Sequence, residues 1–333
     1  MATQNPSSAQ FEDFGQTNSP GTYTPVTLLG NEDRLALKPL TQLELYWRRF
    51  RKHRFAQIGT GFMVFVILMA IAAPLITPGI TASSMNLTLS FGSHGPTLKN
   101  FPDYIFGTTD ELHYSVLALI TYGARTSLMI GFLSALFSVI VGTMVGAISG
   151  YFGGIVDNIM MRITDIFLTI PFFPLLVSLS SILGHGSGVG PAFIITVFTI
   201  FGWAGTSRVI RGVFLSLREL EYTEAAKSVG VNPFRIIIRH LLPNSISPIV
   251  VSFTLAFASF ITFEAALDFL GLGVMFPPTA TWGNTLASAQ GDIANGDWWW
   301  TFFPGLFLTL TVLAISFIGD GLRDALDVRS KID

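Results

Sequence analysis

The sequence predicts an all-α membrane protein with six transmembrane helices. Of its 333 residues, 50% are hydrophobic and only 12% are charged, and the mean hydropathy is +0.57. Soluble domains carry about 25% charged residues, so this composition excludes an ordinary soluble domain. Six uncharged runs reach the roughly 17–25 apolar residues that cross a bilayer. These runs are residues 56–76, 126–150, 166–183, 191–207, 246–263 and 301–319.

The basic residues predict the orientation of these runs. If all six runs span the membrane, all but two of the 19 basic residues fall on one side, and the exceptions are Lys99 and Arg125. Cytoplasmic segments carry the excess of Lys and Arg, so both termini are expected in the cytoplasm. The first run begins too deep in the chain for a signal peptide, which predicts a retained anchor. The absence of cysteine excludes disulfides and thiolate sites.

The segments outside the spans differ in composition. Residues 1–38 are rich in Ser, Thr, Gln, Asn and Pro, which predicts a disordered cytoplasmic tail. Residues 39–54 predict an interfacial basic helix, with a plain basic flank as the alternative. Its start has capping-box spacing at Thr41 and Glu44, and one helical face carries Leu43, Trp47 and Phe50. The other boundaries are 55–78 for the first transmembrane helix, 79–121 for an extracytoplasmic loop and 328–333 for a cytoplasmic tail.

The cytoplasmic segment 216–244 predicts two short helices joined by a bend. Ser216 and Glu219 have capping-box spacing, and Gly230 can end the helix that starts there. Asn232 and Pro233 are suited to the N-cap and first residue of a second helix. The apolar faces comprise Tyr222, Ala225, Ala226 and Val229 in the first helix, and Phe234, Ile237, Ile238 and Leu241 in the second.

Polar residues cover the opposite faces of these two helices, and Pro243 is expected to end the second. They are Glu221, Glu224 and Lys227, followed by Arg235 and Arg239. Periodicity alone leaves two interpretations open. The helices could lie on the membrane surface, or two rigid rods meeting at a glycine could transmit force to a partner.

Glycines and prolines within the spans indicate how the helices pack and bend. Gly142, Gly146 and Gly150 recur every four residues, a spacing that lets helix backbones approach closely. We expect these glycines to serve helix packing rather than a substrate pore. Pro171 and Pro174 predict a bend in the third span, because proline removes a backbone donor.

Two carboxylates lie one helical turn apart near the outer end of the fifth span. Glu264 and Asp268 are costly in a membrane, so they are candidates for a function. Like charges at this spacing repel, so one is expected to be protonated or paired. We expect them to line an outer gate that favours amine groups of substrate. The alternative is hydrogen bonding to neighbouring helix ends.

Several motifs together resemble one transporter family. The order Glu224-Ala225-Ala226, Gly230, Leu242-Pro243 is similar to the EAA loop of binding-protein-dependent ABC importer permeases. Over nearly the whole chain after residue 45, the sequence resembles the C-type permease subunit of dipeptide/oligopeptide (and nickel) ABC importers. The motifs are YGARTSL at 122–128, DNIMMRITDIFLTIPFFPLL at 157–176, EAALDFLGLGVMFPPTATWG at 264–283 and PGLFLTLTVLAISFIGDGLRDALD at 304–327.

The resemblance implies a type I importer fold (MetI-like) in a prokaryotic inner membrane, with a five-helix permease domain at 122–327 and the first span outside it. Its implied partners are a homologous permease subunit forming a heterodimer, two cytoplasmic ABC ATPase subunits and an extracytoplasmic solute-binding protein, besides membrane lipid. Its implied function is ATP-driven import of di- or oligopeptides. The residues implied to couple to the ATPase are Glu221, Glu224, Ala225, Ala226, Gly230, Arg235, Leu242 and Pro243.

Two departures from the family pattern concern the outer side. His113-Tyr114-Ser115 stands where the family usually has Gly-Arg-Asp, and Asp268 stands where it usually has Ser. The first concerns the contacts of the outer loop and the second the outer gate.

The chain itself is expected to be non-catalytic and without a cofactor. A Walker A loop requires Gly before its Lys, and none of the five lysines follows a Gly, so ATP and magnesium are assigned to partner subunits. His94, His113 and His185 lack ligand spacing, so no metal site is expected. Basic residues flank span ends, which does not indicate nucleic-acid binding. Alternative functions are import of nickel chelates or oligosaccharides, or a secondary transporter, which would predict inverted repeats.

Overall fold

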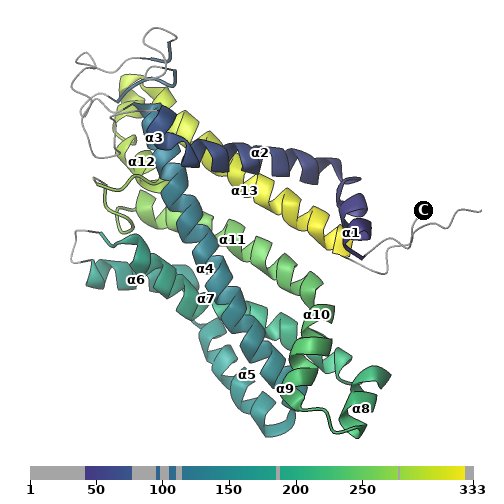
Figure 1. The fold of residues 1–333 in the computed structure, drawn as a ribbon. Coiled ribbons are helices and arrows are strands. Elements are labelled where there is room, and N and C mark those ends of the chain that lie inside the picture. Colours follow the sequence, from purple (N-terminus) through teal and green to yellow (C-terminus); the bar gives the residue numbers. More distant parts are fainter. Residues whose placement is uncertain are drawn as a thin grey trace, which may run out of the picture. The chain divides into compact units, whose positions relative to one another are not determined.

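The computed structural model describes residues 42–76, 95–97, 105–109, 115–184, 188–276 and 278–326 (Figure 1). Within them every regular element is a helix. The tails predicted at 1–38 and 328–333 lie outside the described residues, as does most of the predicted outer loop. The elements are α1 (Gln42–Phe50), α2 (Arg54–Ile71), α3 (Ala73–Ile76), α4 (Val116–Phe152), α5 (Gly154–Thr169), α6 (Phe172–Leu183), α7 (Pro191–Leu217), α8 (Glu221–Ser228), α9 (Pro233–Ile236), η1 (Ile237–Leu241), α10 (Leu242–Asn244), α11 (Ile246–Phe269), α12 (Trp282–Ser288), η2 (Asp292–Asn295) and α13 (Trp298–Leu326).

Five described helices are long and apolar enough to cross a membrane, namely α2, α4, α7, α11 and α13, and the pair α5 and α6 makes a sixth span if counted together. This pair is bent by 72°. The break lies at Ile170 and Pro171, where Ile170 has the extended backbone that a following proline enforces. Pro174 lies in the first turn of α6, where a missing N–H removes no hydrogen bond. The prediction of a bent third span is therefore confirmed.

Helices α4, α7, α11 and α13 are longer than their uncharged runs, and α4 and α7 show why. Helix α4 begins at Val116, so its first turns occupy the end of the predicted outer loop, and α7 continues ten residues beyond 207. Arg125 and Arg208 ended the apolar runs in the sequence without ending the helices. At the start of α4, Ser115 caps the helix by accepting a hydrogen bond from the Ala118 amide, 3.4 Å away. The helices therefore extend past the uncharged runs, because a single charge does not stop a helix, and the predicted domain boundary at 121 stays a prediction.

Glycines set the close packing of α4 on α7. A Cβ atom at Gly142 would lie 2.6 Å from the Trp203 carbonyl oxygen, and one at Gly150 would lie 2.6 Å from the Phe214 Cβ. A Cβ atom at Gly146, between them, would overlap the Ser207 carbonyl oxygen. Only residues without a side chain fit at these three positions, so they hold the two backbones together.

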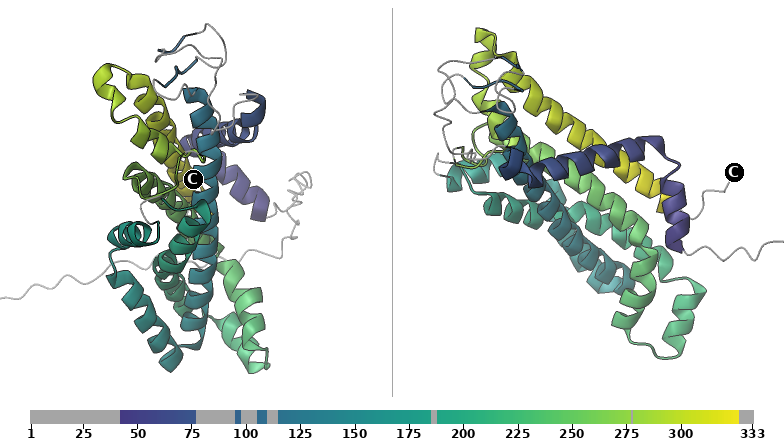
Figure 2. Two further views of the ribbon diagram at one scale, coloured as in Figure 1. Left: turned by 90° about the vertical axis from the view of Figure 1, so that its left-hand side faces the viewer. Right: turned by 45° about the horizontal axis from the view of Figure 1, so that its top comes forward.

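The N-terminal helices pack against α13, which runs beside α2 in both figures (Figures 1 and 2). Phe50 at the end of α1 forms a small apolar cluster with Ala56 and Ala325. His53 caps α2 by accepting from the Ala56 amide, and its other ring nitrogen lies 3.7 Å from an Asp324 carboxylate oxygen. Helix α1 lies within the segment 39–54 for which the sequence predicts a helix.

Candidate functional site

The segment between α7 and α11 begins with a sharp turn. Helix α7 ends at Leu217, and α8 starts at Glu221 after Leu220, whose side chain provides no cap. The predicted capping box at Ser216 is wrong, because Ser216 lies inside α7 and donates to the Gly212 carbonyl. Instead, the fully buried Thr223 hydroxyl donates to the Leu217 carbonyl at 3.0 Å. This bond ties the first turn of α8 to the end of α7.

The bend at Gly230 has the hydrogen bonds of a Schellman motif. Gly230 has φ +77°, its amide donates to the Lys227 carbonyl at 3.0 Å, and the Val231 amide donates to the Ala226 carbonyl at 3.1 Å. The left-handed conformation favours glycine, since other residues carry a steric penalty there. The sequence prediction that α8 stops at this glycine is confirmed.

We expect Gly230→Leu to loosen the bend by about 1–2 kcal/mol, because leucine is strained in the left-handed region. Nothing lies within 4 Å of a Cβ atom at this position, so the effect is conformational rather than a clash. Hydrogen–deuterium exchange should then quicken at the Val231 amide. Gly230→Asn is the matched control, since asparagine visits this region routinely. Equal exchange in both variants would contradict the argument.

The second half of the segment is continuously helical from α9 to α10 and includes one π-helical turn, η1. The Asn232 side chain caps α9 by accepting from the Phe234 amide at 2.9 Å, as its predicted N-cap role requires. Pro243 does not end the helix, contrary to the prediction. Helical structure continues to Asn244, and η1 is a π turn in which the Leu242 amide donates to the Ile237 carbonyl. The Asn244 side chain donates to the His240 carbonyl at 2.6 Å, which satisfies a carbonyl near the proline.

The side chains that are buried in segment 216–244 are mostly not those of the predicted apolar faces. The buried side chains are Thr223, Ile236 and Leu241; the latter two pack with Ala147 of α4 and with Ile210 and Phe214 of α7. Most of the predicted apolar face points outward. The exposed apolar side chains, which we call the bend patch, are Tyr222 (40% exposed), Val229 (78%), Phe234 (70%) and Ile238 (48%). The sequence left open what these faces meet, and within the described residues most of their side chains have no covering neighbour.

Charged residues lie next to those of the bend patch in the sequence. Glu221, Glu224 and Arg235 are exposed, and none of the ion pairs among the described residues involves them. Lys227 instead lies 5.6 Å from the centre of the Tyr151 ring at the end of α4. Ala225 is exposed and Ala226 is half-buried, while Leu242 and Pro243 line an apolar groove of about 640 Å³ between α4 and α11. The predicted coupling residues therefore fall on both ends of the segment and at its bend.

The two carboxylates of α11 lie in a separate buried cluster near α12. The first, Glu264, is fully buried and accepts a hydrogen bond from the Ser127 hydroxyl of α4 at 3.2 Å. Asp268 is 2% exposed, and it accepts from the Val274 amide at 2.6 Å and from the Thr281 hydroxyl. These contacts join α11 to α4 and to the N-cap of α12. The geometry matches the alternative of hydrogen bonding to neighbouring helix ends, and a role in the substrate pathway stays a prediction.

We expect Asp268→Ala to lower the thermal stability of the purified chain. The variant leaves the Val274 amide and the Thr281 hydroxyl without an acceptor, and a lost buried partner costs about 1–3 kcal/mol. Thermal unfolding in detergent measures this effect. A changed preference for lysine-containing peptides in Asp268→Ser, with unchanged stability, would instead support the gate prediction.

Comparison with known proteins identifies the family. Residues 142–332 match the family described as binding-protein-dependent transport system inner membrane component, and residues 41–87 match the N-terminal transmembrane domain of oligopeptide transport permease C. The first match covers more than half of the chain. The chain belongs to this permease family. The resemblance drawn from the sequence motifs is thereby confirmed.

Curated relatives of this permease cover most of its length. The dipeptide transport system permease protein DppC of Bacillus subtilis (strain 168) is 38% identical over 289 residues, which are 86% of this chain and 85% of the relative. The oligopeptide transport system permease protein OppC of the same organism is 36% identical over 302 residues, covering 91% and 94%. Among solved structures, an inward-facing methionine ABC transporter MetNI aligns at 21% identity with a TM-score of 0.49, covering 62% of this chain and 96% of that chain.

Charged contacts between two spans of the permease escaped the sequence analysis. Arg211 of α7 donates two hydrogen bonds of 2.6 Å to the Asp157 carboxylate of α5, and Arg208 of α7 pairs with Asp165 of α5. The signal in the sequence is the opposite charge at the adjoining ends of two neighbouring spans. These pairs hold α5 against α7 near residues 216–244, which we call the bend segment. Among the described residues, no group of three or more His, Cys, Asp or Glu side chains could hold a metal ion.

Proposed function

We propose that this chain is a transmembrane permease subunit of an ATP-binding-cassette importer, forming half of the translocation pathway for di- or oligopeptides. The family match supports the importer class, and the names of the dipeptide and oligopeptide relatives support the substrate class. The partners of such a subunit are a homologous permease, two cytoplasmic ATPases and an extracytoplasmic solute-binding protein. The chain would place both termini and the bend segment in the cytoplasm, as the basic residues predict.

The bend patch is the observation that carries the coupling role. An exposed apolar patch rimmed by polar residues marks an interaction site. Here the patch lies on the element that joins two membrane spans, and it neighbours in sequence Glu221, Glu224 and Arg235, which form no ion pair among the described residues. A cytoplasmic ATPase is the partner that an importer of this family requires at that position. The lipid-surface alternative explains the apolar side chains but gives no role to the exposed carboxylates.

The anchoring of the bend segment explains how a movement of the ATPase would reach the spans. The Thr223 hydrogen bond attaches α8 to α7, and Ile236 and Leu241 pack on the ends of α4 and α7. At the other end, Ser245 joins α10 directly to α11 and donates to the Leu241 carbonyl at 2.9 Å. A displacement of the bend patch therefore pulls on α7 and α11 together. Closure of the ATPase pair on ATP would in this way reorient the spans.

Uptake of labelled dialanine tests the proposed function. In a cell without other peptide importers, the complex containing this chain should accumulate dialanine, and a cell lacking only this chain should not. Uptake that persists without ATP but requires an ion gradient would indicate a secondary transporter. Uptake of a nickel chelate or an oligosaccharide, with none of dialanine, would keep the importer class and reject the peptide substrate.

A further inference from the structure

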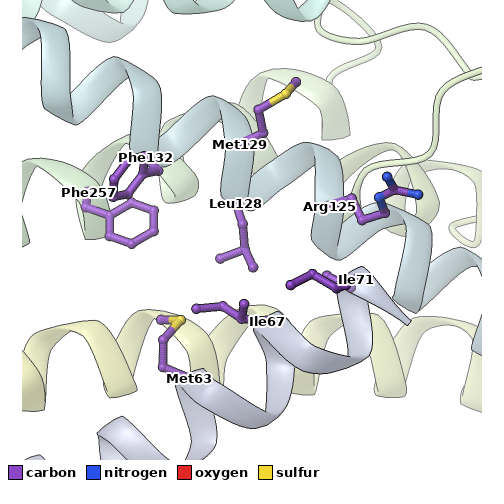
Figure 3. Close-up of a pocket in the computed structure, with 9 residues that line it drawn as sticks. Met63, Ile67, Ile71, Arg125, Leu128, Met129, Phe132 and Phe257 are labelled. Atoms are coloured by element: carbon purple, nitrogen blue, oxygen red, sulfur yellow. The ribbon is translucent and has the colours of Figure 1, made fainter. Parts of the chain in front are cut away.

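An apolar groove between three membrane-spanning helices ends at an arginine (Figure 3). It has a volume of about 500 Å³ and lies between α2, α4 and α11. Ile67 and Ile71 of α2 face Leu128 of α4 across it, and Phe132 and Phe257 lie together at the end away from Arg125 (Figure 3). The groove thus has one charged end and an otherwise apolar lining.

Arg125 forms no ion pair with another residue that the structure describes. Its side chain is exposed, and no hydrogen bond or ion pair involves it in the described part of the chain. A charged side chain in a transmembrane helix is costly unless it meets an opposite charge or the membrane interface. A guanidinium group is well suited to phosphate, because its planar fork donates two parallel hydrogen bonds. Arg125 is therefore suited to bind an anionic group at the end of the groove.

The groove has a length suited to one leaflet. Seven residues of helix separate Arg125 from Phe132, which corresponds to about 10 Å. Half of a hydrocarbon core is about 15 Å thick, so an arginine at the interface would leave this groove within a single leaflet. The distribution of basic residues predicts that Arg125 lies on the outer side of the membrane.

We propose that this groove binds a phospholipid of the outer leaflet, with the lipid phosphate on Arg125 and an acyl chain along Ile67 and Leu128 toward Phe257. A phospholipid matches the groove along its length, because its charged phosphate would meet Arg125 and its acyl chain would meet the apolar lining. A peptide segment fits less well, since its backbone needs hydrogen-bonding partners and Arg125 is the charged group that lines the groove. The bound lipid would fill the groove between α2 and the helices α4 and α11.

Native mass spectrometry of the full chain in detergent, titrated with phosphatidylglycerol, tests this site. Arg125→Gln should weaken lipid binding about tenfold, since hydrogen bonds to charged groups are among the stronger ones. Arg125→Lys should keep most of the binding, because it keeps the charge. Arg323→Gln is the matched control. It changes an exposed arginine near the C-terminal end of α13, away from the groove lining, and it should bind lipid as the unchanged chain does.

Ile67→Trp tests the apolar half independently. Ile67 is 42% exposed, so a larger side chain fills the groove without entering the core, and lipid binding should again fall about tenfold while Arg125 is unchanged. Equal lipid binding by Arg125→Gln, Ile67→Trp and the control would overturn the proposal. Loss of a second permease subunit from the purified complex, with lipid binding intact, would show a protein interface at this groove instead.

Discussion

Glu224→Arg is expected to abolish ATP-driven uptake of dialanine while leaving the spans inserted. Glu224 is exposed beside the bend patch, and reversing its charge there opposes a complementary partner surface, where a like-charge contact costs several kcal/mol. Because its side chain is exposed and forms no ion pair with the described residues, folding should be unaffected. Co-purification of the ATPase subunits should fall together with uptake.

Asp324→Arg is the matched control for this charge reversal. Asp324 is an exposed carboxylate near the C-terminal end of α13, with His53 as its partner at 3.7 Å. The same change of charge at this position should leave both ATPase co-purification and uptake near their original values. Normal assembly and transport by Glu224→Arg would mean that the bend patch does not dock the ATPase.

Gly146→Leu is expected to prevent correct folding of the membrane domain. A Cβ atom at this position overlaps the Ser207 carbonyl oxygen and lies 3.0 Å from the Arg211 amide nitrogen, so the backbone of α7 would have to move. Overpacking of a core costs about 1–3 kcal/mol even where side chains can shift, and here the obstacle is backbone. We expect little monodisperse protein in size-exclusion chromatography.

Gly212→Leu is the control for the glycine stripe. Gly212 also lies in the packed helix pair, but nothing is within 4 Å of a Cβ atom there. This variant should elute and unfold like the unchanged chain. Equal behaviour of the two leucine variants would contradict the close approach of α4 and α7.

The apolar spans and several helix starts, stops and breaks were predictable from the sequence. Hydropathy located the five long apolar helices and the bent pair that makes a sixth span if counted together. Pro171 predicted the break between α5 and α6, and Asn232 and Gly230 predicted a helix start and a helix stop. These features depend on local backbone chemistry, which a short stretch of sequence contains. The ends of α4 and α7 do not follow from the uncharged runs, because a run stops at the first charge while the helix continues.

The faces of the bend segment could not be predicted in the same way. Periodicity places Tyr222 and Val229 on one face, but it does not say whether that face meets the membrane helices or a partner outside the chain. The same limit applies to Asp268, whose partners Val274 and Thr281 follow it in a loop with no periodic pattern. Both arrangements depend on tertiary contacts, which a single sequence does not specify.

Accessibility of a single cysteine tests the central claim that the bend segment lies in the cytoplasm and is covered by the ATPase. The natural chain has no cysteine, so Ser228→Cys gives one exposed thiol on α8, and Asn295→Cys gives one on the opposite side as a control. A membrane-impermeant maleimide should label Ser228→Cys only in inverted vesicles, and added ATPase subunits should block that labelling. Labelling of Ser228→Cys in right-side-out vesicles, or labelling in inverted vesicles that the ATPase does not change, would contradict the account.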